Sequence, residues 1–309
     1  METGVIMEQK PIDGTAPLAP PSADVARQYL DEVEEVHRRR DERVDRRASS
    51  WQAILSGIAV AVLITALLLV NRADATSTQP FVFLVIITGQ ISAGFAERAG
   101  VQWRAVGARS WSVVAVVAYG AAMVAFFLLI FIDAQNRPLW MTFIPGLAIL
   151  LGFGGYGAAL LWRERGQERR PARPREPLPG QTRAATAGLG ILIGIAALSI
   201  GIENALLGSI VGILVMMAVV VWLFLWATDA GPQALGRYWR WPQIAAYLSS
   251  MGVVTWLALQ RAYSDAVTLP SALGAAAAAA ALLCIAACLP APVAAPDTTA
   301  EAEAPSEGR

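Results

Sequence analysis

Long apolar stretches, separated by short charged segments, recur along this chain. Residues 52–70 carry no charged side chain, although six arginines lie just before them between residues 38 and 47. An α-helix needs about 20 mostly apolar residues to cross the hydrocarbon core of a bilayer. Only 16% of the residues are charged, against about 25% in a typical soluble domain. We therefore expect an all-α, polytopic transmembrane helix bundle.

Eight segments have the length and hydropathy expected of membrane-spanning helices. They are residues 52–70, 81–96, 111–132, 139–162, 184–202, 205–226, 242–259 and 267–289. The second segment is the weakest candidate, because it is short and contains Gln90. The apolar stretch 184–226 is too long for one span, so we expect a tight hairpin at Glu203 and Asn204.

Arginines are distributed unevenly between the two sets of connecting segments. With a cytoplasmic N-terminus, residues 38–47 and the cytoplasmic segments between the spans together hold 18 arginines, and the external loops hold only Arg72, Arg137 and Arg261. Basic loops stay in the cytoplasm during insertion. This pattern predicts a bacterial inner-membrane protein with both termini in the cytoplasm.

The segments outside the spans differ in character. Residues 1–21 are rich in proline and small residues and are predicted to be disordered, as is the acidic tail 290–309. Residues 163–183 are basic and rich in proline, which indicates a cytoplasmic connector between two groups of four spans, residues 51–162 and 184–289.

Residues 22–50 are predicted to form a charged, amphipathic cytoplasmic helix. A narrow apolar stripe runs along it, made of Val25, Tyr29, Val33, Val36 and Val44. This organised segment is the candidate binding site for a membrane or cytoplasmic protein. The stripe leaves open whether the helix lies on the membrane or forms half of a coiled coil.

An arginine cluster at the end of this predicted helix is the candidate contact with anionic lipid headgroups. Its members are Arg38, Arg39, Arg40, Arg43, Arg46 and Arg47. Each basic residue near such a surface contributes about 1 kcal/mol to binding. Nucleic acid is not an expected partner, because the net charge is zero and the basic connector lacks interleaved aromatic residues.

Few polar side chains fall within the predicted spans. The candidate set for a polar path through the membrane is Gln90, Thr88 and Ser92 in the second span and Tyr247, Ser249 and Ser250 in the seventh. The same groups can instead form hydrogen bonds between helices or to their own backbone. The small size of the set favours hydrogen bonding over a substrate path.

No catalytic, metal or cofactor site is expected. No Asp, Glu, Lys or Arg lies near the centre of a span, which argues against proton relays and voltage sensing. The string GFGGYG, residues 152–157, lies inside a span, so it indicates close helix packing rather than dinucleotide binding. The pairs Gly190/Gly194 and Gly208/Gly212 indicate packing within the bundle, and Cys284 and Cys288 are expected to be packing residues.

Three hypotheses for function follow. The first is a non-catalytic membrane component or subunit that acts with partners through residues 22–50. The second is a transporter of small molecules or lipids, with Gln90 and the hydroxyls of the seventh span along its path. The third, an intramembrane enzyme, ranks last, because no nucleophile with a base and no set of metal ligands is evident.

Overall fold

The structure is a computed structural model that describes residues 23–43, 46–73, 78–99, 138–163, 178–264 and 266–289, with a few further residues between 117 and 129. All secondary structure in this part of the chain is helical. The chain divides into two units, Met1–Val44 and Asp45–Arg309. The first unit contains α1 (Ala23–Arg43), and all other helices belong to the second.

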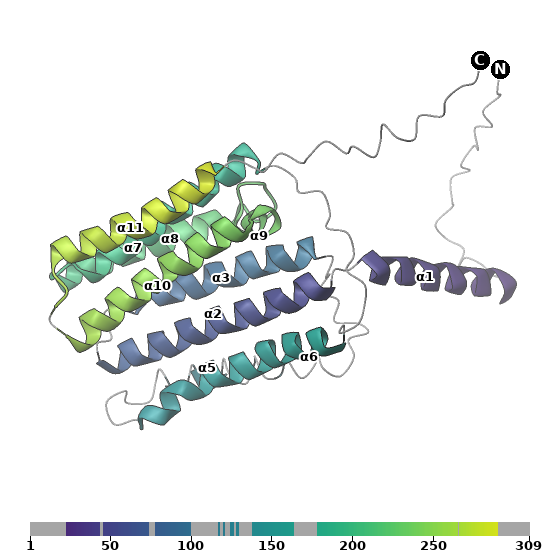
Figure 1. The fold of residues 1–309 in the computed structure, drawn as a ribbon, viewed down its shortest axis with the longest axis horizontal. Helices are drawn as coiled ribbons and strands as arrows, with labels where there is room; N and C mark the ends of the chain where they lie inside the picture. Colours follow the sequence, from purple (N-terminus) through teal and green to yellow (C-terminus); the bar gives the residue numbers. More distant parts are fainter. Residues whose placement is uncertain are drawn as a thin grey trace, which may run out of the picture. The chain divides into compact units, whose positions relative to one another are not determined.

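The second unit is a bundle of long helices lying side by side (Figure 1). Its helices are α2 (Arg46–Ala73), α3 (Gln79–Arg98), α5 (Ile144–Ile149), α6 (Gly155–Arg163), α7 (Gly180–Ile200), α8 (Ala205–Leu223), α9 (Pro232–Tyr238), α10 (Trp241–Tyr263) and α11 (Leu269–Cys288). A 3₁₀ segment, Leu139–Phe143, precedes α5, and a π-helical segment, Leu150–Gly154, joins α5 to α6. These four short elements together form one span.

Seven helices in the described part of the chain are long and apolar enough to cross a membrane. They are Arg47–Ala73, Gln79–Arg98, Leu139–Trp162, Gly180–Ile200, Leu206–Leu223, Trp241–Tyr263 and Leu269–Cys288. Each corresponds to one of the segments predicted from hydropathy, so the prediction of a polytopic all-α protein is confirmed. Most of the remaining predicted span, 111–132, lies outside the described residues.

The first span begins earlier than its apolar composition indicates. Within the predicted cytoplasmic helix 22–50, α1 covers Ala23–Arg43 and α2 begins at Arg46, and residues 44 and 45 lie outside the described part. Residues 46–50, RRASS, contain no glycine or proline that would stop the helix, so α2 continues from them into the apolar run. Arg46 and Arg47 therefore belong to the helix of the first span.

Glycines allow the helices of the bundle to approach closely. A Cβ atom at Gly190 or Gly194 of α7 would lie 2.9 Å from the carbonyl oxygen of Ala280 or Ala276 in α11, respectively. Similarly, a Cβ at Gly157 of α6 would lie 2.6 Å from the Ser50 carbonyl oxygen of α2. Gly208 likewise lies next to the Ser199 carbonyl of α7. The predicted packing role of these glycines within the bundle is thus confirmed.

The fourth predicted span runs antiparallel to α2. Gly157 lies near Ser50 and Ile54, whereas Gly146 lies near Ala61 and Thr65, so the contact moves backwards along α2 as it moves forwards along the span. Ser92, near the end of α3, contacts Gln52 and Ser56, near the start of α2, so α3 also runs antiparallel to α2. The end of α3 and the start of the fourth predicted span therefore lie at opposite ends of the bundle (Figure 1). Most of the segment that joins them, residues 100–137, lies outside the described residues.

The hairpin between the fifth and sixth predicted spans is confirmed. Helix α7 ends at Ile200 and α8 begins at Ala205. The side-chain oxygen of Asn204 accepts hydrogen bonds from the backbone N–H groups of Leu206 and Leu207, at 3.0 and 3.2 Å. This is the N-cap arrangement that satisfies two otherwise free donors at the start of a helix.

Candidate functional site: polar contacts inside the bundle

Two of the predicted path residues, Thr88 of α3 and Tyr247 of α10, lie in direct contact. Their hydroxyl oxygens are 2.8 Å apart, and Thr88 also donates a hydrogen bond of 2.6 Å to the carbonyl oxygen of Leu84. Since the Thr88 proton is committed to that carbonyl, the Tyr247 hydroxyl donates to Thr88. Both side chains are buried, so the pair stabilises the α3–α10 contact.

Trp239, which lies between α9 and α10, extends this buried contact to α7. Its ring lies 5.5 Å from that of Tyr247, measured between centroids, and its Nε1–H donates to the Thr186 hydroxyl at 3.0 Å. Thr186 in turn donates to the Thr182 carbonyl oxygen at 2.7 Å. Indole nitrogen is only a donor. The chain of contacts therefore cannot relay a proton through Trp239, and it serves to hold the helices together.

Gln90 contacts α9 instead of α10. Its Oε1 accepts a hydrogen bond of 3.2 Å from Nε2 of Gln233, the second residue of α9. The Oε1 atom of Gln233 is buried and has no hydrogen-bond partner in the described part of the chain. Gln90 therefore contributes to the docking of α9 on α3.

The α9 helix packs tightly against the second half of α3, and the two run parallel. A methyl group on Gly94 would overlap the Gln233 carbonyl oxygen, and one on Gly236 would overlap the Ile91 carbonyl oxygen. Arg237 forms an ion pair of 2.6 Å with Glu97, and Arg98 donates to the Trp239 carbonyl oxygen at 2.8 Å. The predicted inner loop 227–241 thus contains a helix that belongs to the core.

Ser92 contacts the first span. Its hydroxyl lies 2.8 Å from that of Ser56 in α2, and its carbonyl oxygen accepts from the side-chain amide of Gln52. Thr88, Gln90 and Ser92 therefore contact three different elements, α10, α9 and α2. Gln90 diverges from the other two because residues two apart on a helix point in different directions. Thr88 and Ser92, four apart, share one face of α3, which contacts α10 at Thr88 and α2 at Ser92.

The two serines of α10 also point in different directions. Ser249 is exposed, whereas Ser250 is buried and donates to the carbonyl oxygens of both Ala246 and Ala279, each at 2.9 Å. Gln243, which the sequence did not single out, is buried and donates to the Ala286 carbonyl oxygen at 2.8 Å. Ser250 and Gln243 stabilise the contact between α10 and α11.

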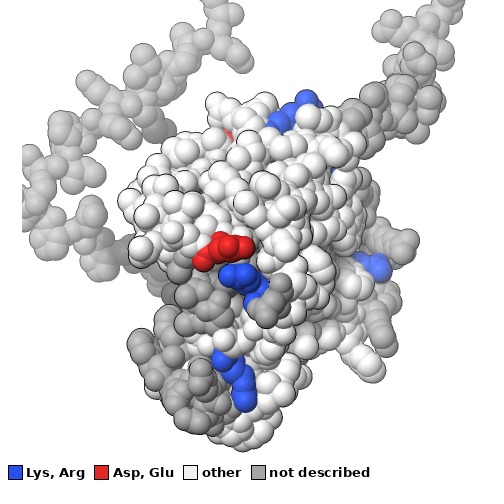
Figure 2. All heavy atoms as spheres, turned by 90° about the vertical axis from the view of Figure 1, so that its left-hand side faces the viewer, with Lys and Arg blue, Asp and Glu red and all other residues white. Residues whose placement is uncertain are grey.

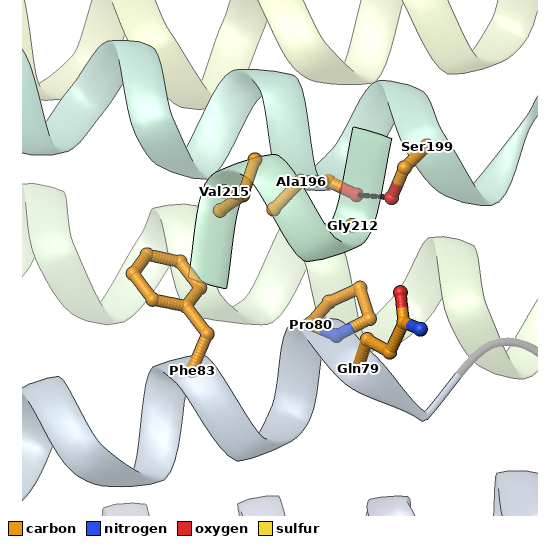
Figure 3. A pocket seen from close by; sticks show the side chains of 7 residues that line it. All are labelled: Gln79, Pro80, Phe83, Ala196, Ser199, Gly212 and Val215. Atoms are coloured by element: carbon orange, nitrogen blue, oxygen red, sulfur yellow. Dashed lines mark hydrogen bonds between the residues drawn. The ribbon is translucent and has the colours of Figure 1, made fainter. Parts of the chain in front are cut away.

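Apart from Thr88 and Tyr247, the polar residues of the two spans form their hydrogen bonds at separate contacts between helices. A small hollow lies elsewhere, between the start of α3 and the facing parts of α7 and α8 (Figure 3). Its volume is about 10 Å³, room for about one water molecule. It is lined by Gln79, Pro80, Phe83, Ala196, Ser199, Gly212 and Val215.

The other candidate residues are placed as follows. Arg47 is exposed, while the side chains of Arg38, Arg39, Arg40, Arg43 and Arg46 lie outside the described part. Cys284 is half-buried beside the Ala187 carbonyl oxygen, and Cys288 is exposed at the end of α11. The described residues contain no group of three or more metal-ligating side chains.

The α9 helix is the main feature that sequence reasoning missed. The signals for it are Gly231, in extended conformation before the helix, and Pro232 in the first turn. Its seven residues are too few to show a helical period by hydropathy. Gly236 is the one residue in it whose identity indicates a close approach of another backbone.

No family model matches this chain, and no curated protein or solved structure is significantly similar to it.

Proposed function

We propose that this multi-pass membrane protein is a non-catalytic membrane component that acts with a protein partner bound through α1. The observation that carries the proposal is the exposure of the large apolar side chains of α1. Tyr29, Leu30, Val33 and Val36 are 63%, 68%, 50% and 54% exposed, in a helix that belongs to a unit separate from the bundle. When a partner covers apolar side chains grouped in this way, their removal from water stabilises the complex.

The spacing of these residues favours a helix as the partner. Tyr29, Val33 and Val36 are separated by four and three residues, which is the spacing of the narrow seam in a coiled coil. A helix that lies on a membrane needs a broad apolar face bordered by basic residues. The first half of α1 instead carries Asp24, Asp31 and Glu32, all exposed, which an anionic membrane surface would repel.

The bundle itself supports a structural role. The buried side chains of Thr88, Tyr247 and Ser250 bind one another or backbone carbonyls, and the small hollow at α3, α7 and α8 has room for about one water molecule. Transport by the bundle is the alternative function. It requires that Gln90 line the path, so transport that survives Gln90→Leu would contradict it.

We also infer the topology and location. The segment 111–132 forms the eighth crossing, because the chain must return from Arg98 to Leu139 between opposite ends of the bundle. Both termini are cytoplasmic in a bacterial inner membrane, with the arginine cluster of residues 38–47 against anionic headgroups. The end of the bundle where α2 begins, which we place on the cytoplasmic side, carries most of the described arginines of the bundle: Arg47, Arg98, Arg163, Arg183, Arg237 and Arg240. The opposite end carries Arg72 and Arg261.

The end of the bundle where α10 joins α11 supports this orientation. Figure 2 shows that end, and its described surface is mostly uncharged, with only a few acidic and basic side chains. A surface poor in arginine is expected on the external side.

The test is purification from native membranes in mild detergent. The seam variant carries Tyr29→Ser, Val33→Ser and Val36→Ser, which remove the three apolar side chains spaced as in a coiled-coil seam. The matched control carries Arg27→Ser and Asp31→Ser, which lie on the opposite face of α1. We expect the seam variant to insert normally and to lose its associated protein, while the control retains it. Identical association for both variants would contradict the proposal.

A further inference from the structure

Arg237 is the one exposed residue of the short helix α9. The other six residues of this helix are buried or half-buried, because α9 packs tightly against α3 through Gly236 and Gly94. The helix therefore presents a single charged side chain at its surface. Its backbone is held in place by close packing, so the position of Arg237 is fixed by the bundle.

An ion pair orients the Arg237 side chain and uses only part of it. The Nε atom donates to Oε2 of Glu97 at 2.6 Å, and the Arg237 side chain remains 40% exposed. The two terminal amino groups of Arg237 form no hydrogen bond within the described part of the chain. These groups carry most of the N–H donors of a guanidinium. Glu97 thus holds Arg237 while most of its donors stay available to another anion.

Two further arginines lie next to Arg237. Arg98 follows Glu97 in α3, and its Nη1 atom donates to the carbonyl oxygen of Trp239 at 2.8 Å. Arg240 is the residue after Trp239. Arg98, Arg237 and Arg240 therefore lie together where α9 leads into α10, and we call them the α9 arginine group. Three guanidinium groups against the one carboxylate of Glu97 leave an excess of positive charge.

The α9 arginine group lies where two candidate membrane spans have their ends. Arg98 is the last residue of the span Gln79–Arg98, and Trp241 is the first residue of the span Trp241–Tyr263. Trp241 is 64% exposed, and tryptophan is enriched at the boundary between the hydrocarbon core and the lipid headgroups. Lipid phosphates are therefore the anions found at the same depth as the α9 arginine group.

We propose that the α9 arginine group binds the headgroup of an anionic phospholipid, with its phosphate on the terminal amino groups of Arg237. A guanidinium can bind a phosphate through two parallel hydrogen bonds, a geometry that a lysine ammonium does not offer. Basic residues between spanning helices recognise anionic headgroups in this way. The site uses none of the arginines of residues 38–47, and it does not depend on a partner of α1.

The test is native mass spectrometry of the full chain, purified in mild detergent and titrated with phosphatidylglycerol or phosphatidylcholine. Arg237→Gln removes the binding group. Arg183→Gln is the matched control, because Arg183 is an exposed arginine of α7 at the same end of the bundle. We expect the native chain to prefer phosphatidylglycerol. Arg237→Gln should lower the affinity for this lipid by about tenfold, and Arg183→Gln by about twofold or less.

A second variant keeps the test independent of folding. Arg237→Gln breaks only a partly exposed ion pair, so it should fold, and its unfolding midpoint in lipid-free detergent checks this. Arg237→Lys retains the charge that pairs with Glu97 but loses the planar guanidinium. It should therefore fold as the native chain does and still bind phosphatidylglycerol more weakly.

Three results would overturn the proposal. The first is equal affinity of the native chain for the two lipids. The second is an equal loss of affinity in the Arg237→Gln and Arg183→Gln variants, or native affinity in Arg237→Lys. The third comes from a titration with inorganic phosphate. If phosphate binds as tightly as phosphatidylglycerol and depends on Arg237 in the same way, the ligand is a soluble phosphate and not a lipid.

Discussion

At the scale of single residues, the Thr88–Tyr247 hydrogen bond predicts an asymmetry between two substitutions. Thr88→Val leaves the buried Tyr247 hydroxyl without its partner, which costs about 1–3 kcal/mol. Tyr247→Phe leaves Thr88 bonded to the Leu84 carbonyl oxygen, so we expect a cost below about 1.5 kcal/mol. Unfolding midpoints in detergent measure both. The double variant should be no less stable than Thr88→Val alone, and a purely additive loss would contradict this account.

Two glycines of α3 give a second prediction. Gly94→Ala drives a methyl group into the Gln233 carbonyl, and such overpacking costs about 1–3 kcal/mol. Gly89→Ala on the same helix meets nothing within 4 Å, so it should leave stability unchanged or raise it by about 0.5–1 kcal/mol. Thermal unfolding of the two variants in the same detergent compares them. Equal effects would show that α9 does not pack against Gly94.

Thr88, Gln90 and Ser92, which lie close together in the sequence, contact three different helices in the structure. Hydropathy singled out Thr88, Gln90 and Ser92 as polar residues in an apolar span, and each does have a hydrogen-bond partner. Their partners were not predictable, because a single helix has polar neighbours on several sides. Tyr247 was the correct partner only for Thr88, while Gln90 pairs with a glutamine in a segment predicted to be a loop.

At the scale of elements, we expect apolar burial to hold the short helix α9 in place more strongly than its surface ion pair does. Leu235 is fully buried, so Leu235→Ala should cost about 2–5 kcal/mol. The Arg237–Glu97 ion pair is about 40% exposed on both sides, so Arg237→Ala should cost less than about 1 kcal/mol. Limited proteolysis between α8 and α10 measures the release of α9. Equal sensitivity of the two variants would mean that the ion pair holds the helix.

The long elements were predictable because a spanning helix must be apolar over about 20 residues, whatever its neighbours are. The Asn204 cap was likewise recognisable, since it interrupts a stretch too long for one span. By contrast, α9 depends on burial of Leu235 and Trp239 against α3 and α7, which only the folded bundle provides. The start of α2 at Arg46 was missed because hydropathy marks the apolar run and not the end of the helix.

At the scale of the whole molecule, the direction of the helices predicts the number of crossings. Helix α3 and the span that begins at Leu139 both run antiparallel to α2, so the end of one and the start of the other lie at opposite ends of the bundle. Leu129, in the segment between them, is buried in a cluster with Ala61, Ile64, Leu68 and Ile149. A chain that returns along α2 in this way would cross the membrane once more, so we expect eight spans.

Single cysteines test both the crossing and the orientation. In the Cys284→Ala, Cys288→Ala background, Pro138→Cys and Glu97→Cys place an exposed thiol just before the fourth predicted span and at the end of α3, respectively. We expect an impermeant maleimide to label position 138 in intact cells and position 97 only after permeabilisation. The opposite pattern would retain eight spans but place the N-terminus outside. Labelling of both positions from one side would mean that residues 111–132 do not cross, since an uncrossed segment leaves its two ends in the same compartment.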